Sequence, residues 1–205
     1  MKIITPLIFL VLVGTPLFYL KESVYPYILS KTLFFQGLVE ILFFLWLILI
    51  FFDKRLRPTF TPLLKALLVF LGVLFMTSIF GVDFHRSFWS TYERMFGIFT
   101  IIHLAALAIV ISSLAPEIPW RKLLYVSLFT AFFVGMLAML QTRIPSLLLV
   151  EPGGRPGATF GNPTFFAGYL LFHIFIALYF LLDLRRGSQI FASIKLFFFG
   201  GALIF

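Results

Sequence analysis

Six long apolar runs dominate this chain, and each is close to the length that a helix needs to cross a lipid bilayer. The hydrocarbon core requires about 20 apolar residues per helix. The runs are Ile3–Leu20, Leu33–Phe52, Leu63–Phe80, Met95–Leu114, Leu123–Leu140 and Phe165–Leu182. The expected fold class is therefore all-α: a polytopic transmembrane helix bundle that forms a single domain over residues 1–205.

A seventh apolar run begins near Ile194 and continues to Phe205, where the sequence stops. It is too short to cross a bilayer, so we expect about six full spans and a truncated seventh. Because natural proteins seldom end inside a span without a polar flank, we expect the protein to continue past Phe205. The first run is long for a signal peptide and no small-residue cleavage site follows it, so it is expected to be a retained span.

Composition agrees with a membrane protein. Mean hydropathy is +1.09, and only 12% of residues are charged, against roughly 25% in soluble domains. In a membrane protein the net charge of +8 is typical of basic loops beside anionic lipid, so we expect no nucleic acid partner. The absence of Cys excludes disulfides, Cys-ligated zinc and Cys nucleophiles.

The distribution of Lys and Arg favours a cytoplasmic N-terminus, because the inner segments then hold more basic residues than the outer ones. In this orientation the loops that carry Arg86, Arg94 and Arg155 face outward. An outward Arg runs against the usual bias, so each of these residues invites a functional explanation.

The loop before the sixth run has the most informative local pattern. Residues 155–166 read R-P-G-A-T-F-G-N-P-T-F-F. Asn162 is a strong N-cap residue, and Pro163 suits the first helical position. A helix N-terminus favours an anion, and Arg155 adds a planar charged fork for phosphate oxygens. With Gly161 in the loop, the pattern predicts a site for a lipid phosphate or pyrophosphate. The alternative is an ordinary loop and a capped helix.

A second candidate segment is 83–97, which we expect to form an amphipathic helix in the outer interface. On a helical projection, one side carries Arg86, Ser90, Glu93, Arg94 and Gly97. Arg86 and Arg94 are then candidates to bind an anionic headgroup. Alternatively, they contact ordinary phospholipid or pair with Glu93.

Three ionisable residues fall inside the predicted spans. His103 and His173 are expected at similar depth near the bilayer midplane, and Glu40 lies in the second span. Such residues are functional candidates by default. The alternative for each His is a neutral side chain hydrogen-bonded within the bundle. Glu40 is expected to be protonated or to pair with an Arg or His on a neighbouring helix, and we assign it no catalytic role.

Several chemical motifs are absent. There is no H-E-x-x-H, P-loop or G-x-S-x-G motif, and no acidic cluster able to hold Mg²⁺. We therefore predict no metal site and no cofactor. Arg side chains are able to take the place of a metal at a pyrophosphate.

Three stretches of the chain resemble the O-antigen ligase and O-antigen polymerase superfamily. They are residues 155–166, whose family form is approximately R-P-x-G-T-F-G-N-P-N-F; Ser87–Gly97 followed by His103; and the opening region with Thr5–Leu7, Tyr25–Tyr27 and Lys31–Glu40. The chain departs from the family at three positions. Ala158 replaces a Gly, Thr164 replaces an Asn, and Gln36 stands where an Arg is expected.

The resemblance implies a multi-pass enzyme of the bacterial inner membrane with a periplasmic active site. Such enzymes build lipopolysaccharide and other cell-envelope polysaccharides. They move a glycan from polyprenyl pyrophosphate to a hydroxyl of a lipid, glycan or protein acceptor, without a metal. By position, Arg155 matches the family's loop Arg, and Arg86 and Arg94 are weaker matches. The family's catalytic Arg and His lie in a late periplasmic loop, which would fall beyond Phe205.

The catalytic residues are accordingly unknown, and residues 1–205 alone are expected to be inactive. Ligase, polymerase and protein glycosyltransferase remain open. Two other classes also remain open: a transporter or lipid-carrier flippase that recognises an anionic headgroup, and an assembly subunit without a ligand.

Overall fold

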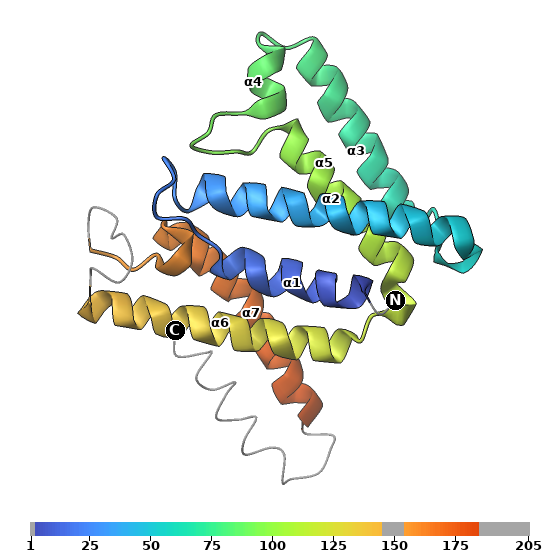
Figure 1. Cartoon of the computed structure of the whole chain (residues 1–205). Helices are drawn as coiled ribbons and strands as arrows, with labels where there is room; N and C mark the ends of the chain where they lie inside the picture. Colours follow the sequence, from blue (N-terminus) through green and yellow to red (C-terminus); the bar gives the residue numbers. More distant parts are fainter. Residues whose placement is uncertain (1–2, 145–153, 185–205) are drawn as a thin grey trace. The chain divides into compact units, whose positions relative to one another are not determined.

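The structure is a computed structural model that describes residues 3–144 and 154–184 of the 205-residue chain. Within these ranges the chain forms seven α-helices and no strand, so the all-α fold class is confirmed (Figure 1). The helices are α1 (Ile4–Leu17), α2 (Ile28–Phe52), α3 (Pro62–Ile79), α4 (Phe84–Trp89), α5 (Ile98–Leu114), α6 (Trp120–Arg143) and α7 (Pro163–Leu184).

Five of these helices are long and apolar enough to cross a membrane: α2, α3, α5, α6 and α7. Their outward faces carry large apolar side chains, such as Phe44, Phe70 and Phe172, that suit contact with lipid. By helix length and hydropathy, the chain is a multi-pass membrane protein.

The first and last of the predicted apolar runs have different outcomes. The first was expected to span, but α1 has only 14 residues and covers about 21 Å, which is shorter than a typical bilayer core. Pro16 lies in the last turn of α1, and a proline disrupts the hydrogen bonds of a helix interior. The predicted seventh run, from Ile194 to Phe205, lies outside the described residues.

The chain divides into two compact units. Unit 1 comprises residues 1–11 and 22–118, and unit 2 comprises residues 12–21 and 119–205. In unit 1, α2 packs against α5, and α5 also contacts α3 and α4. The buried apolar side chains of this unit include Val39 and Leu42 from α2 and Val110 and Leu114 from α5.

The helix predicted over residues 83–97 is wrong beyond Trp89. Asp83 caps α4 by accepting a hydrogen bond of 2.9 Å from the backbone N–H of Arg86. The helix then stops, because Ser90 adopts a left-handed backbone conformation with φ of 66°. Glu93 and Arg94 therefore lie in a turn and do not share a helical face with Arg86.

Gly97 explains why this turn is so tight. A Cβ atom at Gly97 would overlap the carbonyl oxygen of Phe88 and crowd the backbone of Trp89 and Ser90. The chain therefore folds back against the end of α4 before α5 begins. The rings of Phe88 and Trp89 then pack against Phe99 in the first turn of α5.

Unit 2 is built on the contact between α6 and α7. The side chains that α6 contributes are small, which lets two membrane helices approach closely. The buried cluster comprises Ala131, Val134 and Ala138 from α6, Phe166 and Leu170 from α7, and Ala158 from the loop before α7. Farther along, the rings of Tyr125 and Phe180 stack with centroids 4.2 Å apart.

Candidate anion-binding site at the start of helix α7

The loop that precedes α7 is compact because its backbone turns through left-handed conformations. Gly154 and Gly161 have φ of 73° and 69°, and Ala158 has φ of 46°. A Cβ atom on Gly157 would lie 2.7 Å from the backbone carbon of Gly161, so only Gly fits there. Ala158 has this conformation although it is one that favours Gly.

Two buried hydrogen bonds hold this loop within unit 2. The N–H of Ala158 donates to Oε1 of Gln141 at 3.0 Å, and the hydroxyl of Thr159 donates to the carbonyl of Pro16 at 2.6 Å. The ring of Phe160 packs against Tyr169 of α7, with centroids 4.8 Å apart. The loop is therefore hydrogen-bonded to α6 and to the end of α1, and it packs against α7.

The predicted start of α7 is confirmed. The helix begins at Pro163, and the side chain of Asn162 accepts a hydrogen bond of 2.8 Å from the N–H of Thr164. The oxygen of Asn162 is therefore engaged in capping the helix. Its side chain is exposed, whereas Gly161 is buried.

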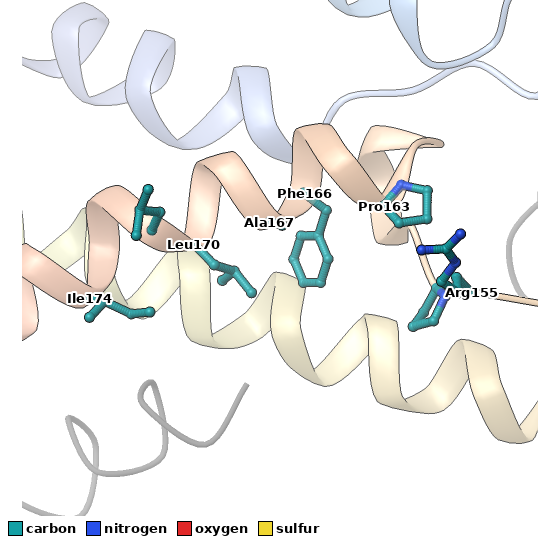
Figure 2. Close-up of a pocket in the computed structure, with 8 residues that line it drawn as sticks. Arg155, Pro163, Phe166, Ala167, Leu170 and Ile174 are labelled. Atoms are coloured by element: carbon teal, nitrogen blue, oxygen red, sulfur yellow. The ribbon is translucent and has the colours of Figure 1, made fainter.

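An apolar pocket of about 400 Å³ runs from this loop along one face of α7 (Figure 2). Its lining residues are Arg155 and Pro156 from the loop, and Pro163, Phe166, Ala167, Leu170, Leu171 and Ile174 from α7. Pro163 and Ile174 are 11 positions apart, so the lined face is about 16 Å long. Figure 2 shows Arg155 at the end of the pocket where α7 begins, with Ile174 at the other end.

The guanidinium group of Arg155 is exposed, and it makes no hydrogen bond or ion pair with any described residue. It is the one charged side chain among the lining residues of an otherwise apolar pocket. A pocket with this polarity suits an amphiphilic anion, whose charged head meets Arg155 and whose hydrocarbon part lies along α7.

Arg86 and Arg94 belong to unit 1. Both are exposed, and the predicted alternative of an ion pair with Glu93 is not seen among the described residues. Arg155 belongs to unit 2, so its cooperation with Arg86 and Arg94 stays a prediction.

The structure brings together two of the three intramembrane residues. Nε2 of His103 lies 3.0 Å from Oε1 of Glu40, and Nδ1 lies 2.7 Å from the carbonyl oxygen of Phe99. Beside this pair, Nε2 of Gln36 donates to the hydroxyl of Thr100 at 3.0 Å. The expected pairing of Glu40 with a His on a neighbouring helix is therefore observed.

His173 has a similar arrangement in unit 2. Its Nδ1 lies 2.8 Å from the carbonyl oxygen of Tyr169, and its Nε2 lies 2.8 Å from the hydroxyl of Ser127 on α6. Because a carbonyl only accepts, Nδ1 carries a proton, and in a neutral imidazole Nε2 then accepts from the Ser127 hydroxyl. This is the hydrogen-bonded His that was the alternative to a functional role.

Sequence reasoning missed Gln141, and it noted Gln36 without assigning it a partner. Each is the one amide side chain of its helix, and each is buried and hydrogen-bonded. A lone Gln in a membrane helix indicates a buried partner, although it does not identify that partner.

Within residues 3–144 and 154–184, no three His, Asp or Glu side chains are grouped closely enough to hold a metal ion. In comparisons with known proteins, no family model, curated protein or solved structure matches this chain.

Proposed function

We propose that this chain is the N-terminal membrane part of an O-antigen ligase-like glycosyltransferase. In this proposal, the spans form a bundle in the bacterial inner membrane, with the N-terminus in the cytoplasm and the Arg155 loop on the periplasmic side. The observation that supports it is the position of Arg155, whose guanidinium group has no partner among the described residues and lies at one end of an apolar pocket beside the capped start of α7.

The proposed ligand, a polyprenyl-pyrophosphate-linked glycan, matches the two parts of the pocket. The guanidinium fork of Arg155 would hold pyrophosphate oxygens, and the N-terminus of α7 would add a favourable dipole. The first isoprene units would lie against Phe166, Leu170 and Ile174. Arg86 and Arg94 are proposed to assist Arg155 at the pyrophosphate.

The reaction needs charge stabilisation at the leaving group. The oxygen of an acceptor hydroxyl forms a bond to the anomeric carbon, and the bond from that carbon to the pyrophosphate oxygen breaks. The hydroxyl proton passes to a general base of the complete protein. Arg155 would stabilise the negative charge that develops on the departing pyrophosphate.

Farnesyl pyrophosphate provides a direct probe of the site, because it combines a short isoprenoid with the same headgroup. We expect the Arg155→Ala variant to bind it about 10- to 100-fold more weakly, the usual effect of losing a charged hydrogen bond. Arg143→Ala is the matched control, because Arg143 is an exposed Arg of the same unit that does not line the pocket. Equal binding by wild type and Arg155→Ala would contradict the proposed site.

A second experiment separates enzyme from transporter. Glycan transfer by the full-length protein that is lost in Arg155→Ala, but kept in Arg143→Ala, supports the glycosyltransferase. Arg155-dependent movement of the lipid carrier between leaflets, without any transfer product, would support a flippase instead.

A further inference from the structure

The paired Glu40 and His103 form a second polar site, in unit 1, that the proposed glycan chemistry does not use. Glu40 is 12 residues from each end of α2, about 18 Å along the helix in both directions. It is the only acidic residue, among the described parts of the five candidate spans, that lies more than one turn from a helix end. An ionisable group at this depth is energetically unfavourable unless its surroundings compensate for the loss of water.

The hydrogen bonds of His103 restrict where the protons lie. The carbonyl of Phe99 only accepts, so Nδ1 of His103 must carry a hydrogen. Nε2 then has two possible states. It either accepts a hydrogen bond from a protonated Glu40, or it carries a second proton and donates to a Glu40 carboxylate. In both states the pair shares one proton and has no net charge.

The surroundings of Glu40 favour the first state. Its side chain is 52% exposed, whereas that of His103 is 8% exposed. The same face of α2 carries Leu33 and Phe44, both exposed, so in a bilayer the open side of Glu40 meets hydrocarbon. Among the described residues, His103 is the only hydrogen-bond partner of the carboxyl group. A carboxylate facing hydrocarbon with one donor is far less favourable than a neutral acid.

We propose that Glu40 is a carboxylic acid that donates its proton to neutral His103, so that α2 and α5 hold a proton-binding site within the bilayer. Transfer of the proton breaks the O–H bond of Glu40 and forms an N–H bond at Nε2 of His103, and the pair stays neutral overall. Gln36 and Thr100 extend the polar groups toward the carbonyl of Met95, in the turn before α5. The site is therefore a candidate for proton exchange inside the membrane.

The test uses dicyclohexylcarbodiimide, a membrane-soluble reagent that modifies protonated carboxyl groups in apolar surroundings. The acid proton moves to a nitrogen of the reagent, the carboxyl oxygen bonds to its central carbon, and rearrangement leaves a stable N-acylurea. We expect peptide mass spectrometry of the full-length protein in vesicles, near neutral pH, to find this adduct on Glu40. Glu40→Gln is the negative control.

The His103→Leu variant distinguishes the two protonation states. A neutral acid should stay reactive without its His, so Glu40 is expected to be labelled in both wild type and variant. Labelling that occurs only in His103→Leu would indicate a carboxylate–imidazolium pair and overturn the proposal. Absence of labelling in both proteins would also overturn it, because the carboxyl would then be covered by another helix.

A measurement on the wild-type protein covers the case in which His103→Leu does not fold. Nitrogen-15 NMR of labelled His side chains should show a protonated Nδ1 and an unprotonated Nε2 at His103. His173 is the internal reference, because its Nδ1 also donates to a backbone carbonyl and its Nε2 lies against the Ser127 hydroxyl, which is not a carboxyl group. Protonation of both nitrogens of His103 would overturn the proposal.

Discussion

Oε1 of Gln141, in the last turn of α6, accepts a hydrogen bond of 3.0 Å from the backbone N–H of Ala158. Both residues are buried, and Ala158 has a left-handed backbone conformation. Arg155 is three residues upstream in the same loop. The position of the candidate anion-binding side chain therefore depends on the amide group of Gln141, which lies 17 residues before Ala158 on a neighbouring helix.

Replacing Gln141 by Leu should loosen this loop. The substitution removes the acceptor and leaves the N–H of Ala158 buried without a partner, which should destabilise the folded protein by about 1–3 kcal/mol. Faster hydrogen exchange at the amides of residues 158–160 would report the change. Thr142→Ala is the control, because Thr142 is an exposed neighbour whose hydroxyl donates to the Met139 carbonyl and not to the loop before α7 as the structure describes it. Unchanged exchange in Gln141→Leu would show that the hydrogen bond does not hold the loop.

The features that the sequence predicted correctly depend on local interactions. The start of α7 was predictable because Asn162 and Pro163 act on the N–H groups of the adjacent turn. The five long spans were predictable because a run of apolar residues is itself the signal for a membrane helix.

The features that the sequence did not predict depend on contacts beyond one helical turn. The helix expected over residues 83–97 ends at Trp89, where Ser90 has a left-handed conformation and the later Gly97 packs against the backbone. Glu40 and His103 are 63 residues apart, so the sequence suggested a His partner without identifying it. The contact of Gln141 with the loop before α7 was missed for the same reason.

Gly157 should tolerate no side chain. A Cβ atom there would lie 2.7 Å from the backbone carbon of Gly161 and 2.9 Å from the nitrogen of Asn162, and neither backbone atom is able to move freely. We expect Gly157→Ala to lower the thermal stability of the detergent-solubilised protein and to weaken binding of farnesyl pyrophosphate. Gly37→Ala, in α2 with no atom within 4 Å of the added carbon, should keep or raise stability. Equal effects of the two substitutions would contradict this account.

The hydrogen bond between Ser127 and His173 should couple α6 to α7. Membrane helices lack a strong hydrophobic force between them, so such bonds contribute to packing, with a coupling energy of about 0.6 kcal/mol on average. A double-mutant cycle of Ser127→Ala and His173→Leu, measured by unfolding in mixed micelles, should give a coupling of about this size. A coupling of zero would mean that the 2.8 Å contact does not stabilise the helix pair.

Two substitutions at Asn162 should separate the stability of α7 from its affinity for an anion. Asn162→Ala removes the cap on Thr164 and should destabilise the protein by about 1 kcal/mol. Asn162→Asp keeps an acceptor at the cap, so the thermal stability should stay close to that of wild type. Its negative charge, however, should repel a pyrophosphate at the same helix terminus and weaken the binding of farnesyl pyrophosphate. Farnesol, which lacks the headgroup, is the control ligand, and its binding should be the same in wild type and Asn162→Asp. If Asn162→Asp binds the pyrophosphate as tightly as wild type does, the anion does not lie at the start of α7.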